Sequence, residues 1–147
     1  MSTINPIVTI ESMRKVIMKI GQLSALTDIS IQTIRFYEKE GLLEVASRGD
    51  NNYRLYDDAA QRQLLFIKHC RNLGLALDEV RVLLEVKTTP EAGCSEVNAI
   101  VDTHIQEVDA RLQELSNLRR QLAALRTKCH SDQSAKDCGI LRELSEA

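Results

Sequence analysis

The chain has no tryptophan, and aromatic residues make up only 3% of its 147 residues. It also lacks any run of about 20 apolar residues that could cross a membrane. No positively charged run followed by an apolar segment stands near its start, so nothing there resembles a signal peptide. From these absences we expect a cytoplasmic protein whose cysteines stay reduced.

An excess of basic residues is also missing, because the formal net charge is −2. Residues 18–71 hold eight Lys or Arg against seven Asp or Glu, and residues 72–147 hold nine against thirteen. Any contact with DNA must therefore come from a few placed arginines. A glycine-rich phosphate loop is absent, and no His and Asp or Asn accompany a thiol in a catalytic pattern, so we do not expect an enzyme.

Hydrophobic spacing predicts two short helices joined by a tight turn. Apolar residues recur every three positions between Met18 and Leu26, which predicts the first helix. Ser30 is a suitable N-cap for a second helix that ends near Gly41. This arrangement is typical of a helix-turn-helix, whose second helix enters the major groove of DNA.

A short hairpin is predicted next, because a turn rich in glycine and asparagine at residues 49–52 precedes an alternating segment at 53–56. This hairpin would form a wing beside the helix-turn-helix. Its arginines and tyrosines carry guanidinium and hydroxyl groups that suit phosphate oxygens. These side chains are Arg48, Tyr53, Arg54 and Tyr56.

Two further helices are expected over residues 57–72 and 77–86, the second capped by Asp78. A hinge or loop at residues 88–93 then leads to a long helix over residues 95–128. Apolar residues recur along it at heptad spacing, which predicts a coiled coil with a second copy of the chain. They are Val101, Ile105, Val108, Leu112, Leu115, Leu118, Leu122 and Leu125.

Three of the four cysteines bracket the long helix and indicate a soft-metal site. Since a helix rises 1.5 Å per residue, Cys94 and Cys129 would lie about 50 Å apart in one chain. No single ion bridges that distance. Antiparallel pairing of two chains would bring Cys94 of one copy beside Cys129 and Cys138 of the other, so the expected site needs a dimer.

Several segments resemble the MerR family of transcriptional regulators. They are Ile20 to Leu23, Thr33 to Leu42 and Asn52 to Tyr56. The spacing of Cys94, Cys129 and Cys138, with Gly139-Ile140-Leu141 after the last, is similar to the lead- and cadmium-responsive branch. The resemblance covers residues 18–144, and many relatives have glycine at Asn52, whose asparagine still tolerates a left-handed turn.

The resemblance implies a homodimer that binds a palindromic operator in promoter DNA and acts on RNA polymerase there. Metal binding would distort the DNA and activate heavy-metal resistance genes. The implied metal ligands are Cys94, Cys129 and Cys138. The implied DNA contacts are Thr33, Arg35, Tyr37, Arg48, Tyr53, Arg54, Tyr56 and Arg71.

Thiolates favour soft or borderline ions, and three sulfurs suit lead(II) and mercury(II). The resemblance favours lead(II) or cadmium(II), with mercury(II) or zinc(II) as alternatives and a redox or organic-ligand sensor as another. Zinc(II) would recruit His130 or water as a fourth ligand. A metal-storage chaperone could use the same thiols but would not need the helix-turn-helix.

For some residues a purely structural role is an alternative to a role in binding metal or DNA. Cys70 is expected to be a buried structural thiol. His130 is either an exposed loop residue or an auxiliary ligand, and His104 is expected to be a polar residue of the helix interface. Phe36 and Tyr37 could both be core residues, and we place only Tyr37 among the DNA contacts.

We therefore predict a mainly α protein. Residues 1–17 would form an N-terminal extension, either a disordered arm or the product of an upstream start site. Residues 18–87 would form a winged helix-turn-helix DNA-binding domain, and residues 88–128 a hinge and an antiparallel coiled-coil dimerisation helix. Residues 129–147 would form a metal-binding loop and C-terminal tail.

Overall fold

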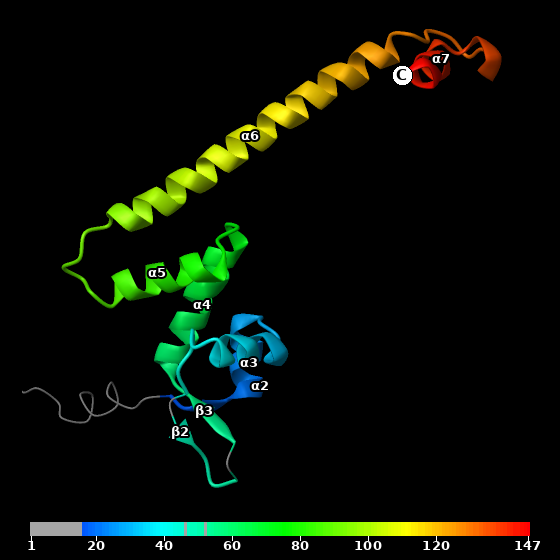
Figure 1. Ribbon diagram of the computed structural model, residues 1–147. Helices are drawn as coiled ribbons and strands as arrows, with labels where there is room; N and C mark the ends of the chain where they lie inside the picture. Colours follow the sequence, from blue (N-terminus) through cyan, green and yellow to red (C-terminus); the bar gives the residue numbers. More distant parts are fainter. Residues whose placement is uncertain (1–15, 46, 52) are drawn as a thin grey trace, which may run out of the picture. The chain divides into compact units, whose positions relative to one another are not determined.

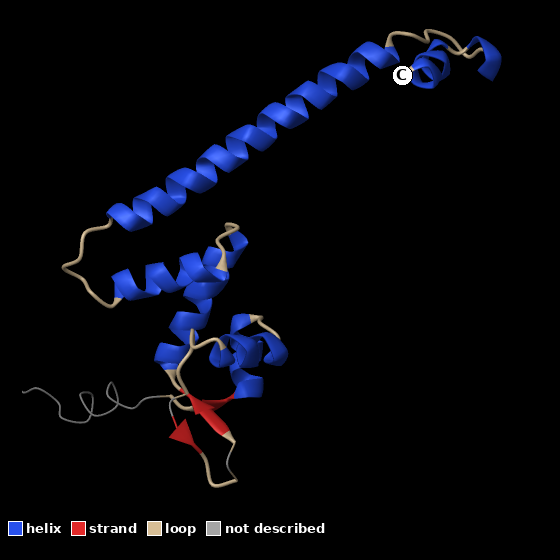
Figure 2. Cartoon of the chain, viewed as in Figure 1, coloured by secondary structure: helices blue, strands red, loops and turns tan. Residues whose placement is uncertain are grey.

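The computed structural model describes residues 16–45, 47–51 and 53–147. Its contacts divide the chain into two compact units, one ending at Gly93 and the other beginning at Cys94. Helices dominate both units, and the only sheet in the described residues has three short strands (Figures 1 and 2). The predicted mainly α class is confirmed. No helix among these residues is both long and apolar enough to cross a membrane.

The helix-turn-helix of the first unit consists of α2 (Ile20–Thr27) and α3 (Ile31–Lys39). Ser30 caps α3 as predicted, since its Oγ accepts a hydrogen bond from the Thr33 N–H at 3.1 Å. Gly41 follows α3 with φ +76°, a left-handed conformation that glycine adopts without steric penalty. The sequence therefore determines both ends of this second helix locally.

The wing is a three-stranded antiparallel sheet in the order β1-β3-β2. Strands β2 (Ser47–Arg48) and β3 (Arg54–Tyr56) form the predicted hairpin. The third strand, β1 (Met18–Lys19), was predicted as the first turn of a helix, and that prediction was wrong. The two β1 residues pair instead with Tyr56 and Leu55, a tertiary contact that outweighs local helical spacing.

Helices α4 (Asp58–Asn72) and α5 (Leu77–Lys87) complete the first unit. Asp57 caps α4 by accepting from the Ala60 N–H at 3.0 Å. The predicted cap of α5 was wrong. Glu79 reaches back to the Ala76 N–H at 2.8 Å, whereas Asp78 lies in the first turn and forms an ion pair with Arg81 at 3.7 Å.

The core of the first unit lies where the helices and the sheet meet. Its fully buried side chains come from α2, α3, β3, α4 and α5 and from the loop after α3. They are Leu23, Thr27, Ile34, Leu42, Tyr56, Leu64, Ile67 and Val80. This core fixes the wing against α3.

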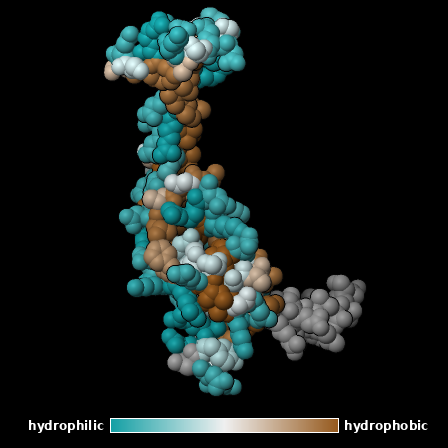
Figure 3. All heavy atoms as spheres, turned by 90° about the vertical axis from the view of Figure 1, so that its right-hand side faces the viewer, coloured by the Kyte–Doolittle hydropathy of each residue, from teal (hydrophilic) through white to brown (hydrophobic). Residues whose placement is uncertain are grey.

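The second unit contains α6 (Ser95–Arg126), the short helix η1 (Ala135–Asp137) and α7 (Gly139–Glu146). None of the 32 residues of α6, all of which the structure describes, is buried within one chain. Its apolar side chains gather in a band along the helix (Figure 3). The exposed members are Val101, Ile105, Val108, Leu112, Leu115, Leu118 and Leu122, which we call the apolar stripe of α6.

Candidate nucleic-acid interface and thiol site

A basic cavity of about 270 Å³ lies between the start of α2, the helix α3 and the wing. The fold brings together cationic side chains that are up to 35 positions apart in sequence. The lining residues are Lys19, Ile20, Arg35, Arg48, Tyr53 and Arg54. Four of the six carry a positive charge, which suits an anionic group such as a phosphate.

The strand register concentrates this charge further. Arg48 on β2 stands directly opposite Arg54 on β3, and like charges in such a pair repel each other unless an anion lies nearby. Arg54 Nη1 lies 3.3 Å from the Glu38 carboxylate. The Lys19 ammonium lies 4.5 Å from the centre of the Tyr53 ring, a cation–π contact that ties β1 to the hairpin.

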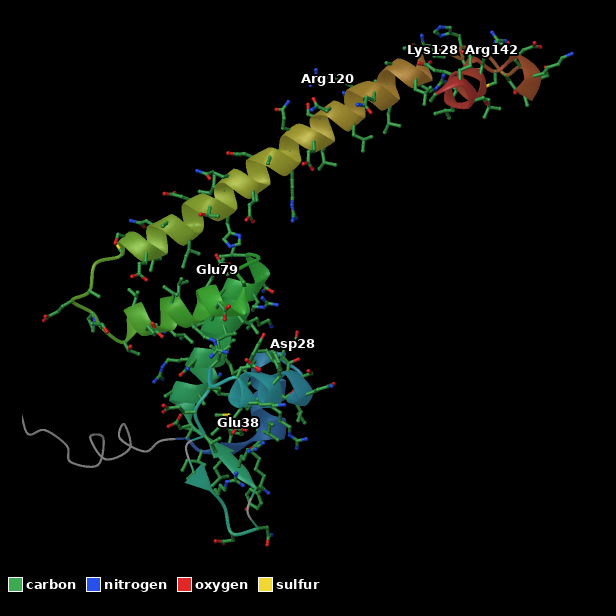
Figure 4. The ribbon with its side chains drawn as sticks, viewed as in Figure 1. Asp28, Glu38, Glu79, Arg120, Lys128 and Arg142 are labelled. Atoms are coloured by element: carbon green, nitrogen blue, oxygen red, sulfur yellow. The ribbon has the colours of Figure 1, made fainter. Side chains whose placement is uncertain are left out.

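A hydrogen bond between Glu38, labelled in Figure 4, and Tyr56 joins α3 to β3 of the wing. The Tyr56 hydroxyl donates to Glu38 Oε2 at 3.1 Å. Burial, together with the charge of Glu38, raises the pKa of Tyr56 to about 12. The side chain of Tyr56 has no exposed surface. It is a core residue in this conformation, and its expected contact with DNA is therefore withdrawn.

The three candidate metal thiols occupy opposite ends of α6. Cys94 is the N-cap residue, and Cys129 lies just beyond the last turn, about 50 Å away at 1.5 Å per residue. The Asn98 amide, one turn into α6, donates to Cys94 Sγ at 3.9 Å. Within the part of one chain that the structure describes, no three His, Cys, Asp or Glu side chains converge closely enough to hold a metal ion.

Cys129 and Cys138, in contrast, lie together at the C-terminal end of α6. Cys138 is the N-cap residue of α7. The pKa of its thiol is lowered most by the Leu141 N–H and less by the Ile140 N–H and by Cys129. Cys129 also lines a cavity of about 320 Å³. The other lining residues are Arg126, His130, Ser131, Asp132 and Ile140.

The position of α7 depends on a close approach at Gly139. A Cβ added there would overlap the backbone carbonyl of Lys128 at the end of α6. The Lys128 ammonium lies 3.9 Å from the Glu143 carboxylate of α7 (Figure 4). These contacts fix the start of α7 on the end of α6 and so place Cys138 beside Cys129.

Two segments of the chain match families of known proteins. Residues 18–87 match the family described as MerR HTH family regulatory protein, and residues 61–125 match the one described as MerR, DNA binding. A Haemophilus influenzae relative, the HTH-type transcriptional regulator ZntR homolog, is 38% identical over 78% of this chain and 85% of its own length. The chain belongs to the MerR family of transcriptional regulators. It is therefore not an enzyme.

Two more relatives support this membership of the MerR family. The Escherichia coli K12 regulator ZntR is 36% identical over 87% of this chain and 92% of its own length. The transcription regulator PbrR691 from Ralstonia metallidurans CH34, whose crystal structure was solved in complex with lead(II), is 47% identical in sequence to this chain. The two structures superpose with a TM-score of 0.73. The match covers 86% of this chain and 98% of that one.

Among the residues expected to contact DNA in this MerR-family chain, Arg35, Arg48, Tyr53 and Arg54 converge on the basic cavity. The Thr33 hydroxyl lies 2.8 Å from Ser30 Oγ in the first turn of α3. The other two expected contacts, Tyr37 and Arg71, are less accessible to DNA. Tyr37 keeps only 8% of its surface exposed, and Arg71 donates to the Leu75 carbonyl at 2.8 Å, closing the turn after α4.

The sequence reasoning missed Lys19 and Glu38, because their roles depend on the pairing of β1 and β3. It also left out Phe36, which is 44% exposed on α3 and so is not a core residue. Asn52 lies outside the described residues.

The remaining cysteine and the histidines fall in separate places. Cys70 is buried, and burial raises the pKa of its thiol, as expected for a structural cysteine. His130 lines the cavity beside Cys129. His104 Nδ1 lies 3.7 Å from the Glu107 carboxylate within α6.

Proposed function

We propose that this regulator works as a homodimer that senses a soft divalent metal ion through Cys94, Cys129 and Cys138. The observation that carries the proposal is the position of the thiols. Two lie together at one end of α6, and the third lies at the other end. The proposed ion is lead(II) or cadmium(II), and the lead(II) complex of the relative that is 47% identical supports this choice.

The apolar stripe of α6 supports a dimer. Its seven large side chains are between 44% and 62% exposed in one chain. Burying the exposed half of each contributes about 1 kcal/mol, so the stripe supplies roughly 7 kcal/mol per chain before the entropy lost on association. An antiparallel coiled coil of two α6 helices would bury it. That pairing would place Cys94 of one copy beside Cys129 and Cys138 of the other.

The donor set fits a soft ion. Thiolates are the ligands that soft and borderline metals prefer, and the backbone N–H groups of Leu141 and Ile140 lower the pKa of the Cys138 thiol. Three sulfurs satisfy the trigonal preference of lead(II). His130 and water are available as a fourth ligand if zinc(II) or cadmium(II) is bound. A bound divalent ion would supply the positive charge that holds three mutually repelling thiolates together.

We propose that residues 18–87 bind one half of a palindromic operator, with the basic cavity on the phosphates. Residues 88–128 would connect and pair the two copies, and residues 129–147 would complete the metal site. Binding of one ion by all three thiolates would draw the 129–147 segment of one copy toward the start of α6 in the other. This changes the angle between the two DNA-binding halves, and the operator is bent and untwisted for RNA polymerase.

Mixed dimers test the shared site. A Cys94→Ser chain is mixed with a Cys129→Ser/Cys138→Ser chain, and the heterodimers are isolated through two different affinity tags. Each heterodimer should bind one lead(II) or cadmium(II) ion tightly, whereas either variant alone should bind none. The parent homodimer, which should bind two, is the control. Heterodimers that bind no metal under reducing conditions would refute the arrangement.

A further inference from the structure

Glu38 places a negative charge on α3, the helix proposed to enter the major groove. Such a charge repels phosphates and by itself weakens DNA binding. The side chain is nevertheless held inside the protein, with only 10% of its surface exposed. Its position in the fold, and not contact with DNA, must therefore account for it.

The contacts of Glu38 are concentrated on β3. Oε2 accepts the Tyr56 hydroxyl at 3.1 Å and lies 3.3 Å from Arg54 Nη1. Oε1 is buried and has no hydrogen-bond partner among the described residues. A single carboxylate oxygen thus binds both Arg54 and Tyr56 of the same strand, and in this way connects the wing to α3.

Arg54 has a second role in the same place, because it lines the basic cavity. A guanidinium carries five N–H donors, so one of its nitrogens can pair with Glu38 while the others remain for a phosphate. Without Glu38, Arg54 would lose the ion pair that holds its guanidinium at this place. Its ordering would then have to occur during DNA binding, which lowers affinity.

We infer that Glu38 is a positioning residue for DNA binding: its carboxylate holds the Arg54 guanidinium in the basic cavity, ready for a backbone phosphate. The inference rests on the proposed DNA interface. It predicts that removing a negative charge from this surface weakens DNA binding. A residue that acted only through its charge would give the opposite sign.

The test uses Glu38→Gln, which keeps size and an acceptor for Tyr56 but loses the ion pair, and Glu38→Asp, which keeps the charge but is one methylene shorter. The matched control is Glu40→Gln, which removes a carboxylate directly after α3 that pairs with Arg81 at 3.0 Å and with none of the described residues of the wing. The probe is a duplex that the parent protein selects from a random pool. Its Kd is measured at several salt concentrations, and thermal melting confirms that each variant is folded.

Both Glu38 variants should bind roughly threefold to tenfold more weakly, the range expected when one long side chain must be ordered during binding. The slope of log K against log salt should become shallower by about 0.9 for each phosphate that the variant no longer neutralises. Glu40→Gln should bind as tightly as the parent or slightly more tightly. In an Arg54→Ala background, Glu38→Gln should have no further effect on the Kd or the slope, which a general loss of structure would not produce.

Parental or tighter binding by Glu38→Gln would overturn the inference, as would full additivity with Arg54→Ala. These results would leave the proposed DNA interface intact, because the parent would still bind the selected duplex. A parent protein that selects no duplex would instead refute the proposed interface, and the role of Glu38 with it.

Discussion

Replacing Cys138 with serine separates metal binding from folding. Cys138 is the N-cap residue of α7, and the backbone N–H groups of Leu141 and Ile140 lower the pKa of its thiol. Serine is among the preferred N-cap residues, so Cys138→Ser should keep α7 in place or stabilise it by about 1 kcal/mol. The variant should therefore be a folded protein that lacks one of the three proposed ligands.

The size of the loss follows from the number of ligands. Structural zinc sites with four ligands bind with about 10–16 kcal/mol, or roughly 3 kcal/mol for each ligand. A hydroxyl is a poor ligand for soft ions, so most of that contribution disappears. Affinity for lead(II) or cadmium(II) should fall by about two orders of magnitude. Operator binding without metal should stay at the parental level, while metal-dependent activation in vitro should be lost.

Competition against a chromophoric chelator under reducing conditions measures the affinity. Cys70→Ser is the matched control, because it makes the same chemical change at a buried cysteine in the first unit. It should lower stability without changing metal affinity. If Cys138→Ser binds and responds to metal as the parent does, Cys138 is not a ligand. The proposed metal ligands would then be Cys94, Cys129 and His130.

Three further changes test other parts of the molecule. Arg35→Ala should weaken operator binding by about 1–3 kcal/mol if Arg35 contacts a base edge, and by less if it contacts only a phosphate, and a gel-shift titration showing undiminished affinity would remove it from the interface. Gly139→Ala should displace Cys138 and weaken metal binding about tenfold, whereas Gly21→Ala, whose added Cβ would meet open space among the described residues, should have no effect on the same chelator competition. Since folding raises the pKa of Tyr56 from near 10 to about 12, its contribution is present below pH 10 and is lost as the pH rises to 12. Denaturant titrations should show the parent losing about 2–3 kcal/mol over that range, and a Tyr56→Phe protein with the same loss would contradict the assignment.

Features that depend on local chemistry could be predicted from the sequence. The cap at Ser30, the left-handed Gly41, the hairpin and the long helix all follow from residues close to one another. The separation of Cys94 from Cys129 needed only the rise of a helix.

Features that depend on distant pairing could not be predicted in this way. Met18 forms a strand because its partner Tyr56 lies 38 positions later, and the same pairing buries Tyr56. Two residues with helix-capping chemistry stand side by side at Asp78 and Glu79, and only the geometry shows that Glu79 is used. Lys19 enters the basic cavity through β1, so its local sequence carries no sign of it.

The length of α6 has a consequence for genetics. Because the helix separates Cys94 from Cys129 and Cys138, no single polypeptide carries a complete set of neighbouring ligands within its described residues. Under the proposed pairing, an allele lacking Cys94 and an allele lacking Cys138 would each fail alone, yet a cell carrying both would regain a response through its mixed dimers. Intragenic complementation is therefore expected between mutations at opposite ends of the helix, and not between two mutations at the same end.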